Sequence, residues 1–178
     1  MRGLLALLLI WVATSAGAAI TLPDALSKRI KGDPAAYLDE VAGLIAGYGT
    51  AGGIDAAGLD QVVALTRAGA RASAFARLMR ADLDGDGAVQ TAEMAVLAAS
   101  VAAEDRGKLA VLFARADTDG DGKVAPAEIQ AYAGAAGQAS YSDAKAGQLR
   151  AVMAFDGNGD GRVTLDEVKS GLTALGLS

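Results

Sequence analysis

The chain has 178 residues, of which 52% are hydrophobic and 21% charged, and it contains neither cysteine nor histidine. The missing residue types exclude disulfides, zinc sites built from thiolates or imidazoles, and nucleophiles that depend on a histidine base. The formal net charge of −5 argues against nucleic acid and anionic membrane surfaces as partners, whereas it is compatible with cation binding.

The first nineteen residues have the pattern of a secretory signal peptide. Arg2 precedes an apolar run over residues 4–12, and an A-x-A site formed by Ala16 and Ala18 follows. An uncleaved membrane anchor is the alternative, but a span needs about 20 apolar residues. We therefore expect residues 1–19 to be a signal peptide that is removed by cleavage after Ala18 or Ala19. The mature chain is then secreted or periplasmic, with no stable membrane anchor.

A helix is predicted to begin at Asp33-Pro34, because proline is tolerated in the first helical turn. Apolar residues recur after it at helical spacing. They are Tyr37, Leu38, Val41, Leu44, Ile45 and Tyr48. We expect this face to pack into a core.

Three later segments of twelve residues share one pattern of acidic residues and glycines. They cover residues 82–93, 117–128 and 156–167, here called the first, second and third loops, and each reads D-x-[DN]-x-[DN]-G-x5-E. Positions one, three, five and twelve are Asp82, Asp84, Asp86 and Glu93; Asp117, Asp119, Asp121 and Glu128; and Asp156, Asn158, Asp160 and Glu167. Position seven, where a backbone carbonyl would be the ligand, is Ala88, Lys123 and Arg162.

This spacing suits a hard cation. Calcium takes six to eight oxygen ligands, and a loop coiled around the ion offers every second side chain. Glycine at position six permits a sharp turn, and glutamate at position twelve can bind with both oxygens. Magnesium prefers a smaller octahedral shell, so the bidentate glutamate favours calcium. Solvated Asp-Gly turns are the alternative for a single match, but the pattern occurs three times.

With these motifs the chain resembles the EF-hand calcium-binding superfamily, and within it four-hand proteins of the calmodulin type. The resemblance covers about residues 34–177 and implies an all-α fold of helix-loop-helix pairs in two lobes, with Ca²⁺ as cofactor. The chain departs from calmodulin in its alanine-rich composition, its export signal and one missing loop. Dockerin modules use similar loops but end them in aspartate, where this chain has Glu93, Glu128 and Glu167.

A degenerate hand is expected before the first loop. The β-branched residues at position eight, Val89, Val124 and Val163, fit the short strands that join paired hands. Val124 lies 35 residues after Val89, and Ile54 lies the same distance before Val89. Apolar residues at helical spacing occur on both sides of Ile54. Its ligand positions would be Gly47, Gly49, Ala51 and Gly58, none of which has a side-chain oxygen. This hand is therefore expected not to bind calcium.

We expect the hands to pair in chain order. Residues 20–100 would form one pair, with the degenerate hand and the first loop side by side and Ile54 opposite Val89. Residues 101–178 would form the other, with both loops binding calcium, and residues 134–142, which are rich in helix-breaking residues, would be a linker.

The predicted function is non-enzymatic. Eleven of the 21 acidic residues are assigned as calcium ligands, and no pair of base and nucleophile is evident among the rest. We expect an exported protein that holds about three calcium ions as a buffer, a sensor or a calcium-stabilised module. The alternative is a calcium-dependent interaction module that binds a partner protein through a hydrophobic surface.

Overall fold

The structure is a computed structural model that describes residues 20–177, so the predicted signal peptide, residues 1–19, lies outside the described part. The fold is all-α, as predicted, with only short strands. In chain order the elements are α1 (Asp24–Gly32), α2 (Pro34–Tyr48), β1 (Ile54–Asp55), α3 (Ala56–Met79), β2 (Val89–Gln90), α4 (Thr91–Ala99), α5 (Ala103–Ala116), β3 (Lys123–Val124), α6 (Pro126–Ser140), α7 (Asp143–Arg150), the 3₁₀ helix η1 (Ala151–Phe155), β4 (Arg162–Val163) and α8 (Leu165–Ala174).

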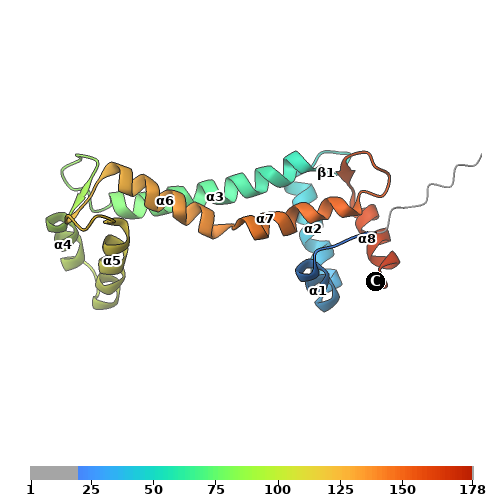
Figure 1. Ribbon diagram of the computed structural model, residues 1–178, viewed down its shortest axis with the longest axis horizontal. Coiled ribbons are helices and arrows are strands. Elements are labelled where there is room, and N and C mark those ends of the chain that lie inside the picture. Colours follow the sequence, from blue (N-terminus) through green and yellow to red (C-terminus); the bar gives the residue numbers. More distant parts are fainter. Residues whose placement is uncertain (1–19, 178) are drawn as a thin grey trace, which may run out of the picture.

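The described chain is elongated, with a lobe at each end of a helical connector (Figure 1). Helix α3 runs from one lobe to the other, and α6 and α7 return beside it. We call one end the terminal lobe; it contains α1, α2, β1, the start of α3, η1, β4 and α8. The other end, the central lobe, contains the end of α3, β2, α4, α5, β3 and the start of α6.

The hands do not pair in chain order. Strand β1 pairs with β4, which places Ile54 opposite Val163, and β2 pairs with β3, which places Val89 opposite Val124. The prediction that Ile54 faces Val89, and with it the pairing within residues 20–100 and within residues 101–178, was wrong. The physical reason is the length of α3, which joins the degenerate hand to the first loop. At 1.5 Å per residue this unbroken helix is about 36 Å long, so the two loops lie at opposite ends of the molecule.

The connector is closely packed and helical. The expected linker at residues 134–142 is part of α6 as far as Ser140. Buried Gly137 faces α3 so closely that a Cβ there would lie 2.9 Å from the carbonyl oxygen of Arg67. The Arg67 guanidinium donates to the Tyr141 carbonyl (2.8 Å) and to Asp143 (2.7 Å), and so bridges α6 and α7.

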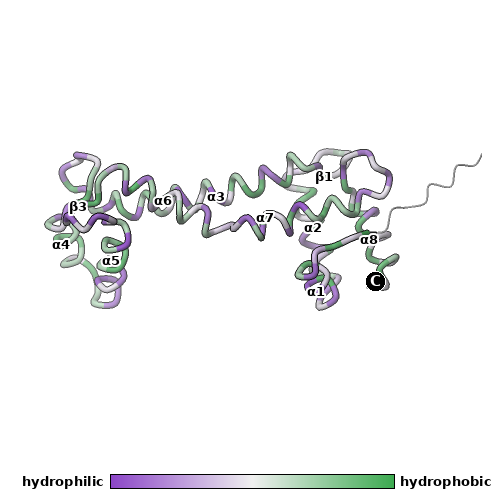
Figure 2. Tube along the Cα trace, viewed as in Figure 1, coloured by the Kyte–Doolittle hydropathy of each residue, from purple (hydrophilic) through white to green (hydrophobic). Residues whose placement is uncertain are grey.

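Each lobe has its own apolar core. The terminal core comprises Leu26, Ile30, Tyr37, Val41, Ile54, Leu59, Val63, Ala146, Leu149, Val152, Phe155, Val163, Val168 and Leu172. The central core comprises Leu78, Ala81, Val89, Met94, Leu112, Ala116, Val124 and Ile129. Figure 2 shows the apolar segments of both lobes in green. Within residues 20–177, every helix is too short or too polar to cross a membrane.

Candidate metal centre

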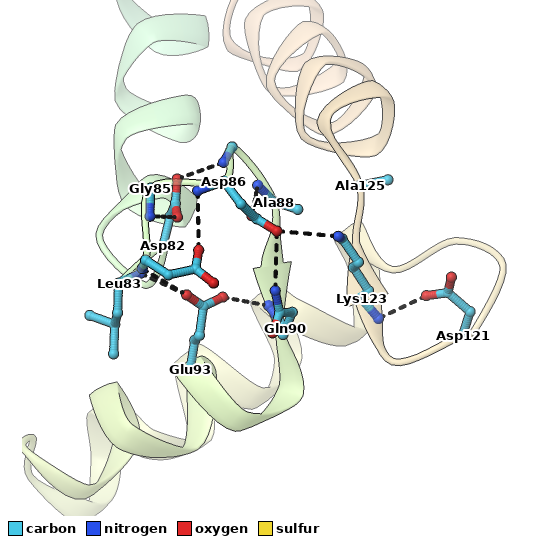
Figure 3. A network of polar contacts seen from close by, with 12 residues as sticks. Asp82, Leu83, Gly85, Asp86, Ala88, Gln90, Glu93, Asp121, Lys123 and Ala125 are labelled. Atoms are coloured by element: carbon cyan, nitrogen blue, oxygen red, sulfur yellow. Dashed lines mark hydrogen bonds and ion pairs between the residues drawn. The ribbon is translucent and has the colours of Figure 1, made fainter.

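The aspartate at position one fixes the first turn of each complete loop. Asp82 accepts a hydrogen bond from the N–H of Gly85 (2.8 Å; Figure 3) and another from the N–H of Gly87 (3.1 Å). The same pattern occurs in the second loop at Asp117 and in the third at Asp156. The glycines at position six, Gly87, Gly122 and Gly161, have φ values of 83°, 84° and 80°. This left-handed conformation explains why glycine is required there.

The glutamate at position twelve joins the two ends of its loop. Glu93, which is 8% exposed, accepts from Leu83 N–H (2.7 Å) with one oxygen and from Gln90 N–H (2.9 Å) with the other (Figure 3). Glu128 makes the corresponding contacts in the second loop. A carboxylate has about four lone-pair sites, so these glutamates retain capacity for a cation.

These contacts favour the charged forms of the carboxyl groups. The Thr118 hydroxyl, followed by the N–H groups of Ala125 and Thr118, lowers the pKa of Glu128 to about 2. The N–H of Gln90, followed by that of Leu83, lowers the pKa of Glu93. The N–H of Ala88 lowers the pKa of Asp86. Deprotonated carboxylates are the form that binds a metal ion.

Two groups of carboxylate oxygens converge among the described residues. Oxygens of Asp82, Asp84 and Asp86 lie within 4.8 Å of one another, and so do oxygens of Asp117, Asp119 and Glu128. Calcium–oxygen distances of 2.3–2.6 Å place ligands on opposite sides of an ion about 5 Å apart, so both groups have the dimensions of a calcium site. The sequence-predicted ligands Glu93 and Asp121 lie in the same loops but outside these groups.

The third loop differs from the other two at position three, where asparagine replaces aspartate. The Asn158 amide donates to Asp160 (3.1 Å), and the Asn158 N–H lies 3.4 Å from Glu167. Glu167 is also bonded at the far end of the loop, by the N–H and the hydroxyl of Thr164, each at 2.9 Å. With an amide in place of a carboxylate at position three, this loop has one carboxylate fewer at its ligand positions than the other two.

The position-seven residues differ in their side chains. Ala88 is buried, whereas the Lys123 ammonium lies 3.4 Å from Asp86 in the neighbouring loop. The Arg162 guanidinium donates to the Thr50 hydroxyl in the degenerate hand. Sequence reasoning did not anticipate the part played by Thr118 at position two, because the loop motif leaves that position unspecified.

The degenerate hand has a short connection in place of a metal loop. Residues 49–55 separate α2 from α3, whereas residues 80–90 separate α3 from α4. Gly53, with φ of 104°, approaches β4 so closely that a Cβ would lie 2.5 Å from the Val163 carbonyl oxygen. This connection therefore supports the third loop by contact.

Comparison with known families agrees with this geometry. The EF-hand family model matches residues 109–131 and 151–172, which contain the second and third loops. These two matches support an EF-hand calcium-binding family for the chain. EF-hand segments of this kind imply calcium binding. The first loop lies outside the matched segments but has the same hydrogen bonds at positions one and twelve as the second. No curated protein and no solved structure matches the chain significantly.

Proposed function

We propose that this EF-hand protein is an exported, non-enzymatic calcium-binding protein that binds one ion in each complete loop. The main support is the convergence of carboxylate oxygens within 4.8 Å in the first and second loops, since unneutralised charges at that distance repel one another. The third loop has the same ligand pattern with one asparagine. The residues that would bind the ions are the twelve side chains at positions one, three, five and twelve, with the carbonyls of Ala88, Lys123 and Arg162.

The predicted export signal favours a location where calcium is abundant. Extracellular EF-hand sites of modest affinity, with dissociation constants of about 10⁻⁴–10⁻³ M, are occupied under such conditions. Binding to the native state would stabilise the fold, so the proposed role is calcium-dependent stabilisation or buffering.

Replacement of the position-twelve glutamates tests this proposal. Glu167→Gln removes one charge and the bidentate contact, so the third site should lose affinity while the first and second sites keep theirs. Asp166→Asn is the matched control, because it removes the same charge from an adjacent side chain that is 93% exposed. Calcium titration followed by NMR at the position-six glycine amides resolves the individual sites. Equal affinities of the parent and Glu167→Gln at Gly161 would contradict the assignment.

A second candidate function is the binding of a partner protein through a hydrophobic surface. The observation that favours it is an open groove of about 970 Å³ on the central lobe, with apolar residues from several helices in its lining. Grooves of this kind, lined by helices, receive the apolar face of a partner helix in a recurring mode of peptide recognition.

A further inference from the structure

The central-lobe groove is apolar at its base and open to solvent. It lies between the ends of α3 and α4, helix α5, and α6. The apolar residues that line it are Leu97, Val101, Leu109, Val111, Leu112 and Tyr132. Val111 is 52% exposed, although it lies beside the buried Leu112 on α5. No helix of the described chain covers this surface.

The terminal lobe, in contrast, contains an additional helix from its own chain. Helix α1 precedes the first hand and packs on α2. Its Leu26 and Ile30 are 2% and 0% exposed and belong to the terminal core, together with Leu149 of α7. Helices α2 and α7 enter the two hands of that lobe, as α3 and α5 do in the central lobe. A lobe of this protein can therefore accept an amphipathic helix against its entering helices.

Charge contributes to the docking of α1. This helix carries Lys28, Arg29 and Lys31 against one acid, Asp24. Arg29 forms an ion pair with Glu40 on α2 and lies over the Tyr37 ring, 5.8 Å from its centroid. In the terminal lobe, a basic helix thus meets an acidic side chain on the surface that it covers.

The central groove, in contrast, presents basic side chains that are unpaired within residues 20–177. Arg77 of α3, Arg80 directly after that helix and Arg115 of α5 line it, and among the described residues none of them has an ion-pair partner. The two acids in the lining are paired with Lys108 at 2.7 and 3.2 Å, so they leave the arginines uncompensated. Such a basic rim stands out in a chain with a net charge of −5.

The apolar segment at the start of the chain does not complement the positive charge of this groove. Residues 1–19 contain Arg2 and no acidic residue. An occupant with negative charges beside an apolar face would complement both features of the groove, since electrostatic complementarity determines which partners are accepted.

We propose that the central groove binds an acidic amphipathic helix of a partner protein, with its apolar face on α5 and its carboxylates at Arg77, Arg80 and Arg115. This inference rests on the second candidate function. It does not depend on the number of calcium ions that the chain binds.

Two synthetic peptides test the proposal. Both are helices of about 18 residues with leucines spaced i, i+3, i+4 and i+7, one with glutamates beside the leucines and the other with lysines at the same positions. Fluorescence anisotropy of labelled peptide measures binding to the full chain, in saturating calcium and in chelator. The glutamate peptide should bind at least roughly tenfold more tightly than the lysine peptide in one or both conditions, with a preference that shrinks at high salt.

Charge reversal in the groove provides the matched test. Arg115→Glu should weaken the glutamate peptide roughly fivefold or more and strengthen the lysine peptide. Arg106→Glu is the control, because Arg106 is an exposed arginine on the same helix that does not line the groove. It should leave the preference unchanged.

The outcomes that would contradict the proposal distinguish the acidic character of the partner from the interaction function itself. Equal binding of both peptides would overturn the acidic partner but leave the interaction function intact. Binding of neither peptide by a chain that still binds calcium in calorimetry would overturn both. Self-association of the chain, or binding to phosphatidylglycerol vesicles without peptide binding, would show that another occupant takes the groove and would also overturn the proposal.

Discussion

At the scale of single residues, two carboxylates organise each complete loop. The aspartate at position one accepts N–H groups from the first turn, and the glutamate at position twelve accepts N–H groups from both ends. Both residues follow directly from the sequence motif. The contribution of Thr118 does not, because a hydroxyl at position two becomes relevant only when the loop brings it 2.6 Å from Glu128.

Tyr37 in the terminal core gives a prediction at this scale. Its hydroxyl is buried without a hydrogen-bond partner among the described residues, and burial raises its pKa from 10.0 to about 12. Because the folded-state pKa is raised, the stability that depends on the neutral phenol is present below pH 10 and is lost as the pH rises towards 12.

Tyr37→Phe should therefore increase the free energy of unfolding by about 1 kcal/mol at neutral pH, since it removes an unsatisfied buried group. It should also reduce the loss of stability between pH 10 and 12. Urea unfolding at both ends of this range measures the effect. A destabilised variant, or one with unchanged alkaline sensitivity, would contradict the burial of an unpaired hydroxyl.

At the scale of elements, the helices beside the loops were predictable, whereas the continuation of α6 through the expected linker and the pairing of the strands were not. The start of α2 follows from Asp33-Pro34, and the Asp33 side chain accepts the Ala36 N–H as expected of a helix cap. The four β-branched strand residues, however, are chemically equivalent as partners. The choice among them depends on whether residues 56–79 form one helix or two, which is decided by the packing of α6 and α7 along α3.

The observed pairing predicts which calcium site depends on the degenerate hand. Ile54→Ala leaves a cavity beside Val163, at a cost of about 2–5 kcal/mol, so it should weaken calcium binding in the third loop. The other two sites lie in the other lobe and should be unaffected. Val89→Ala is the mirror control, with effects confined to the first and second loops. Site-resolved NMR titration of both variants with calcium distinguishes the two pairings. Weaker calcium binding in the first loop of Ile54→Ala would support pairing in chain order instead.

The connector gives a second prediction for an element. Gly137→Ala places a methyl group 2.9 Å from the Arg67 carbonyl oxygen and should destabilise the fold by about 1–3 kcal/mol, because α3 and α6 must separate. Gly134→Ala, one turn earlier on α6, meets nothing within 4 Å and should stabilise the helix by up to about 1 kcal/mol. Urea unfolding of the two variants compares them. Similar stabilisation by both would show that the helices are not in close contact at Gly137.

At the scale of the whole molecule, the lobes differ in both metal sites and surface. The terminal lobe combines one complete loop with a degenerate hand, and the apolar face of its own helix α1 packs into its core. The central lobe combines two complete loops with an open, basic groove. This division could not be predicted from the sequence, because the position of α1 and the identity of each lobe follow from the pairing of the first hand with the last.

Calorimetric titration of the chain with calcium tests the assignment of sites most directly. We predict a stoichiometry of three ions per chain, with the third loop the weakest site because Asn158 replaces a carboxylate, and a melting temperature that rises with calcium. A stoichiometry of four would show that the degenerate hand also binds, and the absence of binding at millimolar calcium would contradict the assignment of all three loops.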